Sequence, residues 1–267
     1  MEHLSSLENR TIYILREAYS RFKDTALLWS IGKDSTTMLW LARKAFFGKI
    51  PFPIIHIDTG YKFKEIYEFR DKYAKEWALD LIISKNEPAL AEKICPERGK
   101  LECCNALKTE ALKFTIKKHA LKALILAIRR DEHGIRAKER YFSPRASDFT
   151  WNYQDQPAEL WDLYKSGLGI KEEHFRIHPM LHWTELDIWR YIQKEKIPVV
   201  DLYFAKRGKR FRSIGCESCC MPVDSHANTI AKIVKELETT KIAERSGRAQ
   251  DKEDTYTMQK LRSLGYM

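Results

Sequence analysis

Two kinds of hydrophobic pattern alternate along the first half of the chain. Apolar residues with helical spacing predict four amphipathic helices, at residues 4–22, 34–47, 64–77 and about 105–119. Short apolar runs between them predict four strands, at residues 26–30, 54–57, 81–84 and 121–128. The last run is apolar on both faces, as expected of a buried parallel strand.

This alternation predicts an α/β fold with a doubly wound, mostly parallel sheet and helices on both faces. In such folds, ligands bind beyond the C-terminal ends of the strands, so polar residues at strand ends are the first site candidates. We divide the chain into a domain at residues 1–205 and a C-terminal extension at residues 206–267, which holds a cysteine cluster and a helical tail.

The first strand end carries the segment Ser30–Ser35, which reads Ser-Ile-Gly-Lys-Asp-Ser. A glycine and two hydroxyl groups at the start of a helix suit a phosphate, because backbone N–H groups and the positive end of the helix dipole face the anion. Lys33 adds a positive charge. We predict that five residues hold a nucleotide here: Ser30, Gly32, Lys33, Asp34 and Ser35. An ordinary strand-to-helix turn is the alternative.

Two further strand ends carry charged residues. Asp58 follows the second strand, where its carboxylate could orient a nucleotide or Mg²⁺, or could cap a turn. Arg129 and Arg130 follow the fourth strand and precede three more cations within residues 136–140. Forked guanidinium groups suit sulfate and phosphate, so we expect both arginines to act with Lys33 on the reacting groups. A salt-bridged surface helix is the alternative.

The composition favours a protein that binds small anions. The 267 residues are 44% hydrophobic and carry a net charge of +10, which suits nucleotides, sulfate or, less favourably, nucleic acid. No apolar run reaches membrane-spanning length and no signal-peptide pattern is present, so we expect a cytoplasmic protein without a membrane partner. Six cysteines in such a protein favour a metal or redox site over disulfides.

Several segments resemble known families. The Ser30–Ser35 loop resembles the pyrophosphate loop of the N-type ATP pyrophosphatases, which cleave ATP between the α and β phosphates. Along nearly the whole chain, other segments resemble the small, ATP-binding subunit of sulfate adenylyltransferase, which shares its fold with the phosphoadenylylsulfate reductases. They include Gly48–Pro53, His56–Gly60, Tyr67–Asp71, Arg129–Glu132, Arg136–Arg140, Glu159–Trp161, Trp183–Trp189, Leu202–Phe204, and Glu244-Arg245 with Gly247-Arg248.

This resemblance implies a nucleotidyltransferase that converts ATP and sulfate into adenylylsulfate and pyrophosphate. ATP would be bound with Mg²⁺ bridging its β and γ phosphates, which the Ser30–Ser35 loop would hold. Arg129 and Arg130 would neutralise the sulfate or the α-phosphate. The product anhydride is unfavourable, and the family couples its synthesis to a separate GTPase large subunit.

The cysteines depart from that pattern. The pair Cys103-Cys104, followed at a distance by Cys216 and Cys219, resembles the iron–sulfur ligand set of adenylylsulfate reductases, and Lys108 matches the lysine beside that cluster. We expect these four thiolates to converge near the nucleotide cleft and hold a [4Fe–4S] cluster. Zn²⁺ and unliganded buried thiols are the alternatives.

The cysteine set is also compatible with two other enzymatic functions. A reductase of adenylylsulfate or phosphoadenylylsulfate requires a nucleophilic cysteine in the C-terminal tail, and residues 221–267 contain none. An iron–sulfur sulfurtransferase that adenylylates its acceptor is the other alternative. Cys220 is the alternative fourth metal ligand, and we expect Cys95 to be free.

Overall fold

The computed structural model describes residues 3–165, 167, 172–248, 261 and 265. Its centre is a six-stranded sheet with the strand order β3-β2-β1-β4-β6-β5. The strands are β1 (Thr25–Leu28), β2 (Ile54–Ile57), β3 (Leu81–Ser84), β4 (Ala123–Ile125), β5 (Phe142–Ala146) and β6 (Glu172–Ile177). Neighbouring strands are parallel except β5, which runs antiparallel to β6. The predicted α/β fold class is therefore confirmed.

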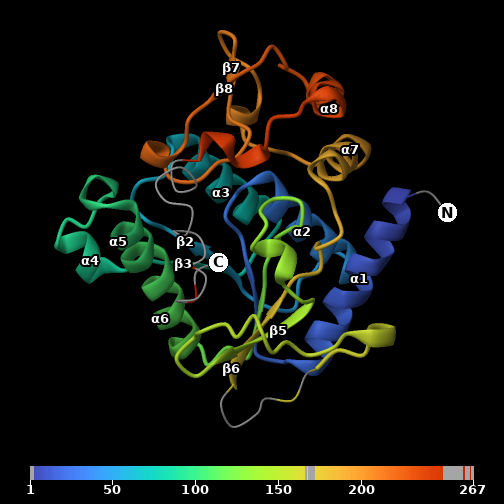
Figure 1. The fold of residues 1–267 in the computed structure, drawn as a ribbon, viewed down its shortest axis with the longest axis vertical. Helices are drawn as coiled ribbons and strands as arrows, with labels where there is room; N and C mark the ends of the chain where they lie inside the picture. Colours follow the sequence, from blue (N-terminus) through green and yellow to red (C-terminus); the bar gives the residue numbers. More distant parts are fainter. Residues whose placement is uncertain (1–2, 166, 168–171, 249–260, 262–264, 266–267) are drawn as a thin grey trace.

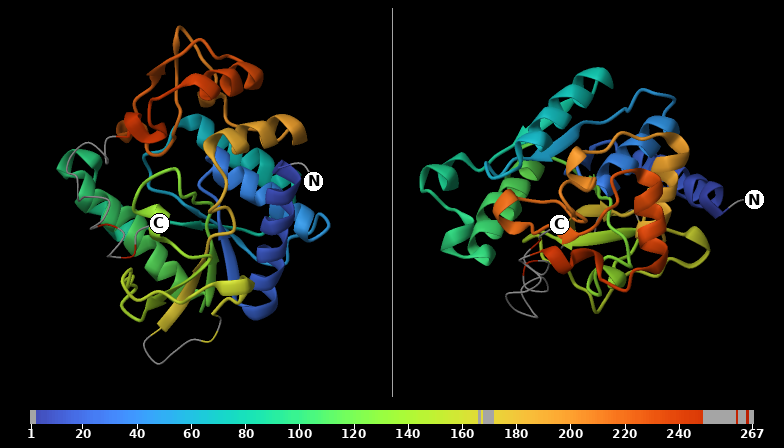
Figure 2. Two further views of the ribbon diagram at one scale, coloured as in Figure 1. Left: turned by 45° about the vertical axis from the view of Figure 1, so that its right-hand side comes forward. Right: turned by 90° about the horizontal axis from the view of Figure 1, so that it is seen from above.

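Helices cover both faces of this sheet (Figures 1 and 2). They are α1 (His3–Arg21), α2 (Lys33–Ala45), α3 (Lys64–Glu76), α4 (Glu87–Ala91), α5 (Lys100–Cys104), α6 (Ala111–Lys118), α7 (Glu185–Glu195) and α8 (Ile230–Thr239). Right-handed crossovers through α2 and α3 connect β1 to β2 and β2 to β3, so that each new strand is added on the same side of the sheet. The chain then returns through α6 to the other side of β1, which places α6 on the opposite face.

Shorter helical pieces connect these elements. A π-helical segment, η2 (Asn105–Glu110), joins α5 to α6. The 3₁₀ turns are η1 (Pro96–Arg98), η3 (Arg136–Lys138), η4 (Leu160–Asp162), η5 (Asp201–Tyr203), η6 (Glu217–Cys219) and η7 (Glu244–Gly247). The predicted helix at 105–119 is thus longer than expected, because helical backbone already begins at Lys100 and changes its pitch at η2.

Burial explains which elements the sequence pattern shows. Every residue of β1, β2 and β4 is buried, so these strands appear as mostly apolar runs, interrupted only by Thr25 and His56. α1 instead buries one stripe that includes Ile14 and Leu15.

At the start of α7 a capping box forms, in which Asp187 N donates to Thr184 Oγ1 at 3.1 Å and Thr184 N donates to Asp187 Oδ2 at 3.0 Å.

Residues 206–248 lie over one end of the sheet, at the top of Figure 1. They contain a two-stranded ribbon, β7 (Lys209–Arg210) with β8 (Val223–Asp224), and α8, which packs against α7. Isolated backbone bridges join Lys62 to Cys216 and Cys220 to Arg248. The domain boundary after residue 205 stays a prediction.

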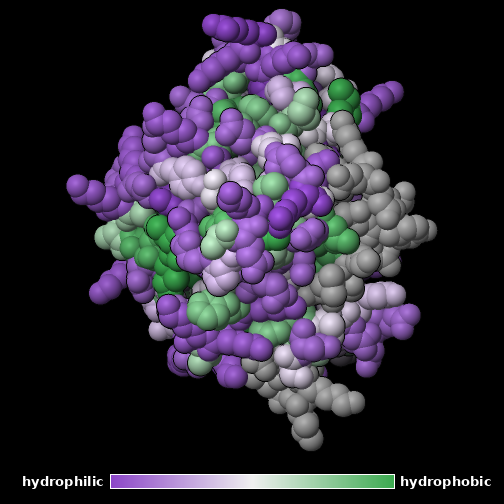
Figure 3. All heavy atoms as spheres, turned by 90° about the vertical axis from the view of Figure 1, so that its left-hand side faces the viewer, coloured by the Kyte–Doolittle hydropathy of each residue, from purple (hydrophilic) through white to green (hydrophobic). Residues whose placement is uncertain are grey.

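The surface over α4, α5 and α6 is mostly hydrophilic, with small hydrophobic patches (Figure 3). Among the described residues, no helix combines the length and the hydrophobicity needed to cross a lipid bilayer.

His174 in β6 is a buried titratable group. Its ring lies against that of Phe149, with 5.2 Å between centroids, and neither ring nitrogen has a hydrogen-bond partner among the described residues. Burial, followed by the charge of Arg176, lowers the pKa of His174 from 6.5 to about 2. The unfolded chain therefore takes up this proton at a much higher pH than the folded protein.

The His174→Leu variant should resist acid better than the parent. Neutral His174 makes its full contribution to the free energy of unfolding above pH 6.5. This contribution is lost on acidification, because below that pH protons bind the histidine of the unfolded chain and not that of the folded protein. Between about pH 8 and about pH 4.5, the free energy of unfolding of the parent should fall roughly 3 kcal/mol further than that of the variant. Urea unfolding at both pH values measures this, and equal losses would contradict it.

Candidate active site

A cavity lies beyond the C-terminal ends of β1 and β4, where the winding direction of the chain reverses. This switch point is where doubly wound sheets bind ligands. The cavity is open to solvent on one side. Apolar side chains such as Ile55 and Leu126 line it together with hydroxyl groups and cations. Such walls suit a ligand that combines an apolar ring system with several negative charges.

The predicted phosphate loop forms part of this wall. Ser30, Gly32, Lys33, Asp34 and Ser35 all line the cavity. Gly32 is the N-cap of α2 and offers no side-chain cap. Ser30 Oγ and Ser35 Oγ lie 3.0 Å apart, and Ser35 Oγ donates to the Gly32 carbonyl oxygen at 3.1 Å. The positive end of α2 therefore opens onto the cavity beside two hydroxyl groups.

The surrounding structure holds this loop in a strained conformation. The hydroxyl of Tyr203, from η5, accepts a hydrogen bond from Lys33 N at 2.8 Å. Ile31 is buried with φ 67°, a left-handed conformation that costs a β-branched residue about 1–2 kcal/mol. Such strain persists only where the surrounding structure imposes it, which is common at ligand sites.

Lys33 is buried in a network of ion pairs. Its ammonium group lies 3.0 Å from Asp34 Oδ2 and also pairs with the carboxylate of Glu244 in η7. Arg129 pairs with Asp34 and Glu244 as well, and with Asp131 at 2.9 Å. Burial alone would raise the pKa of the Glu244 carboxyl, but Arg129 and Lys33 outweigh it and hold this pKa below its usual value. Glu244 therefore stays ionised and links the C-terminal segment to the phosphate loop.

The other predicted residues of this site lie outside the described cavity lining. Arg130 stacks its guanidinium group over the Tyr141 ring, 5.6 Å from the centroid, and donates to the Glu139 carbonyl oxygen at 3.5 Å. Asp58 accepts from Gly60 N at 2.9 Å and from the Tyr67 hydroxyl at 2.8 Å. Asp58 thus makes the turn-capping contacts that were the alternative to ligand binding. Direct ligand binding by Arg130 and Asp58 stays a prediction.

Further cations line the cavity and come from distant parts of the chain: Lys62, Lys108, Arg136, Arg245 and Arg248. Arg136 and Arg245 both pair with Glu132, in the case of Arg245 at 3.1 Å. Burial would raise the pKa of Glu132, but these two arginines outweigh it and hold the pKa well below its usual value. Together with Lys33 these cations outnumber the described carboxylates of the lining, Asp34 and Glu132, so the cavity favours a multiply charged anion.

The four predicted metal ligands lie near one another. Cys103 and Cys104 end α5. Cys216 directly precedes η6 and is bridged to Lys62, and Cys219 is the last residue of η6. Cys103 interacts electrostatically with the other three thiols. In the part of the chain that the structure describes, no three His, Cys, Asp or Glu side chains form a group that could hold a metal ion. Convergence on one metal centre therefore stays a prediction.

Cations surround these thiols. Lys108, in the π-helical segment, donates from Nζ to Cys104 Sγ at 3.6 Å. Burial raises the pKa of the Cys216 thiol, but Lys108 and Lys62 outweigh it and bring this pKa down to about 7. Burial and then the neighbouring thiol of Cys104 raise the pKa of Cys103 to about 12. Of these two thiols, only Cys216 thus has thiolate character at neutral pH; a bound metal would be needed to ionise Cys103 and to compensate the mutual repulsion of the sulfurs.

Cys220 is placed differently from these four cysteines. Its sulfur accepts hydrogen bonds from Gly215 N at 3.0 Å and from Arg248 Nη1 at 3.3 Å. The thiol therefore ties η6 to the segment that follows η7. These contacts favour Cys219 over Cys220 as the fourth metal ligand.

Sequence comparisons place the chain among proteins of sulfur metabolism. Residues 24–222 match the phosphoadenosine phosphosulfate reductase domain. The chain is 40% identical to the sulfate adenylyltransferase subunit 2 of Rhizobium meliloti (strain 1021), over 99% of this chain and 93% of that protein. It is also 40% identical to the protein of that name from Pseudomonas aeruginosa strain PAO1, over 100% of this chain and 98% of that protein.

Solved structures share the fold at low sequence identity. A phosphoadenylyl-sulfate reductase from Candida auris, in a phosphate complex, has a TM-score of 0.56 and 18% identity, over 84% of this chain and 97% of that chain. The FMN adenylyltransferase of Candida glabrata, in complex with ATP, has a TM-score of 0.57 and 19% identity, over 82% of this chain and 63% of that chain.

Proposed function

The chain belongs to the family of sulfate adenylyltransferase subunit 2, and from this premise we propose that it transfers the adenylyl group of ATP to sulfate. One observation carries the proposal for this cavity: the loop at the N-terminus of α2 meets a cation-rich wall at the switch point of the sheet. The helix N-terminus suits the β and γ phosphates, and the remaining cations suit a second anion beside the α-phosphate.

The proposed reaction needs positioning more than proton transfer. A sulfate oxygen attacks the α-phosphorus of ATP, a new S–O–P linkage forms, and the bond to the β-phosphate breaks to release pyrophosphate. Sulfate is already an anion at neutral pH, so no base has to deprotonate it. The protein must therefore hold two mutually repelling anions together and neutralise the charge that develops on pyrophosphate.

Individual residues take different parts in this task. We assign the β and γ phosphates to the backbone and hydroxyl groups of the Ser30–Ser35 loop and to Lys33, which exchanges Glu244 for a phosphate oxygen when ATP binds. Lys62, Lys108 and Arg248 are assigned to the sulfate and α-phosphate side. Arg129 acts as a positioning residue, because it holds Asp34 and Glu244 around Lys33.

We propose two inorganic cofactors. Mg²⁺ bound together with ATP would neutralise phosphate charge, and Asp34, a carboxylate of the cavity lining, would bind the ion or its waters. The thiolates of Cys103, Cys104, Cys216 and Cys219 would hold a [4Fe–4S] cluster, with Zn²⁺ as the alternative. Such a centre would fix α5 and η6 at the edge of the cavity.

We also propose a partner and a location. The relatives are named as one subunit of a larger enzyme, and adenylylsulfate contains an anhydride whose synthesis from ATP is unfavourable without coupling. A GTPase large subunit is therefore the proposed partner, since GTP hydrolysis would supply the missing free energy. Because both nucleotides are cytoplasmic substrates, the proposed location is the cytoplasm.

The products released from ATP distinguish this function from ordinary ATP hydrolysis. With ATP, Mg²⁺, sulfate and the partner subunit, we expect pyrophosphate to form, and its rate to depend on sulfate. Chromatography of α- and γ-labelled ATP measures which phosphate bond is cleaved. Release of ADP and orthophosphate alone would contradict the assignment.

A further inference from the structure

An exposed hydrophobic cluster lies at η4, away from the described lining of the cavity. The side chains of Leu160, Trp161 and Leu163 are 62%, 87% and 67% exposed. Single exposed apolar residues are ordinary on protein surfaces, whereas several that lie together usually mark a contact site. The segment Glu159–Trp161 is one of those that resemble the family, yet the chemistry proposed above makes no use of it.

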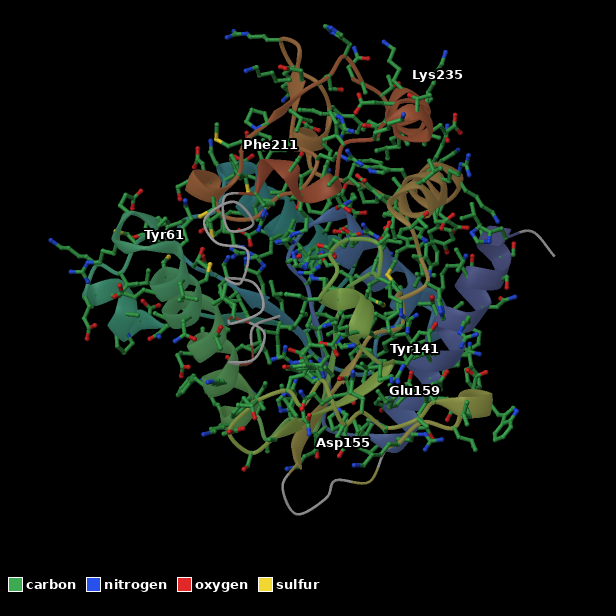
Figure 4. All side chains as sticks on the ribbon, in the orientation of Figure 1. Tyr61, Tyr141, Asp155, Glu159, Phe211 and Lys235 are labelled. Carbon is green, nitrogen blue, oxygen red and sulfur yellow. The ribbon has the colours of Figure 1, made fainter. Side chains whose placement is uncertain are left out.

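Specific contacts hold this segment in place. The carboxylate of Glu159 accepts hydrogen bonds from Tyr141 N at 3.0 Å and Phe142 N at 2.8 Å, and Figure 4 shows Glu159 beside Tyr141. Asp162 accepts from Arg10 of α1 at 3.0 Å and from the Tyr164 hydroxyl at 2.8 Å. The segment is therefore anchored on both sides of Trp161.

The backbone between these anchors is strained. Trp161 and Asp162 have φ values of 52° and 56°, in the left-handed region that costs residues other than glycine about 1–2 kcal/mol each. Behind them Tyr164 is buried, with its ring stacked on Phe142 at 4.5 Å between centroids. The structure thus imposes an unfavourable conformation that keeps the indole in water, and burial of this indole on a partner would compensate the cost.

The surroundings of the cluster have the composition of a protein interface. Arg10 and Asp162 form a half-exposed ion pair at its edge, Arg21 donates to the Tyr164 carbonyl oxygen at 3.3 Å, and Lys165 is exposed. An apolar centre that contains tryptophan inside a charged rim is typical of binding hot spots. The rim holds charges of both signs, since Arg10 pairs with Asp162 and Arg21 with Glu17, while the whole chain carries a net charge of +10, so an acidic surface is the complementary partner.

We propose that Leu160, Trp161 and Leu163 form the docking site for the GTPase subunit, which would offer an apolar pocket for the indole and carboxylates for the rim. This inference rests on the partner proposed above. A second contact favours that partner: Tyr141, which donates to Glu159, also carries the guanidinium group of Arg130 on its ring. A subunit docked at η4 would therefore be linked to Arg130, the neighbour of Arg129, through Glu159 and Tyr141.

Affinity measurements with the full chain and the purified GTPase subunit of the same source test this proposal. Trp161→Ser should weaken the complex by roughly 30-fold or more, the loss expected of a hot-spot tryptophan. Phe114→Ser is the matched control, because Phe114 is also exposed, at 62%, but lies on α6. It should change the affinity by less than about twofold. Trp161→Phe should restore most of the binding, which separates loss of the contact from misfolding.

Three results would overturn the proposal. They are unchanged affinity of Trp161→Ser, equal losses in Trp161→Ser and Phe114→Ser, and self-association of the parent chain that Trp161→Ser abolishes, since this would assign the cluster to a second copy. Pyrophosphate release by the parent complex, measured in the same preparations, keeps this test separate from the proposed function. If pyrophosphate forms while Trp161→Ser binds normally, the docking site alone is wrong.

Discussion

Replacement of Lys33 by alanine is expected to lower kcat/KM for adenylylsulfate formation by roughly 10²–10³-fold, or about 3 kcal/mol of transition-state stabilisation. The ammonium group lies at the start of α2, where the departing pyrophosphate would be held, and it is already desolvated among charged neighbours. A charge fixed in such surroundings stabilises developing negative charge far better than it would in water. Lys33→Arg should recover little activity, because its fork needs more space than the buried ammonium site provides.

The matched control for this substitution is Lys49→Ala. Lys49 is exposed after the end of α2 and does not line the cavity. We expect Lys49→Ala to retain parental kinetics. Thermal unfolding without ligand shows whether Lys33→Ala has lost its fold, because removal of the lysine leaves Arg129 to balance Asp34 and Glu244. A folded Lys33→Ala protein with normal turnover would exclude Lys33 from the reaction.

Substitution of Cys216 by serine should remove bound metal almost completely and lower the melting temperature. Serine cannot supply the thiolate, and structural thiolate–metal sites contribute on the order of 10 kcal/mol in small domains. Here the site would join α5 to η6, two segments that lie far apart in the sequence. Iron and zinc analysis of anaerobically purified protein, together with its absorption near 400 nm, measures occupancy and metal type.

Two other cysteines provide controls for this experiment. Cys95→Ser should keep both metal and stability, because Cys95 lies outside the group of four thiols. Cys220→Ser should keep the metal but lose some stability, because its sulfur accepts two hydrogen bonds. A parent protein that contains neither iron nor zinc, or a Cys216→Ser protein with full occupancy, would contradict the predicted metal centre.

Four of the six strands could be predicted from the sequence, three of them because their burial is continuous. β1, β2 and β4 are buried at every position and were visible as apolar runs. β5 and β6 escaped prediction because they carry charged residues into the interior: Arg145 and Arg176 are buried there, and Pro144 interrupts the pattern of β5. Glu139 compensates the buried charge of Arg145 through an ion pair at 2.8 Å, and no local sequence pattern predicts this contact.

The candidate site likewise contains residues that could be predicted from the sequence and residues that could not. The Ser30–Ser35 loop could be found because a phosphate loop is a local motif between a strand and a helix. Glu244, by contrast, lies 211 positions from Lys33, and Tyr203 lies 170 positions from it. The only local signal for Glu244 was its place in a segment that resembles the family. Arg130 and Asp58 also follow strand ends, but their described contacts are with neighbours such as Tyr141 and Tyr67, so direct ligand binding by these two residues stays a prediction.

Transfer of radioactive sulfate into adenylylsulfate tests the central claim most directly. The full chain with its GTPase partner, ATP, GTP and Mg²⁺ should form labelled adenylylsulfate and pyrophosphate in equal amounts, and Lys33→Ala in the same complex should form almost none. Pyrophosphate release that does not require sulfate, or that leaves no label on the adenylyl group, would show that the acceptor is a different molecule and would contradict the account.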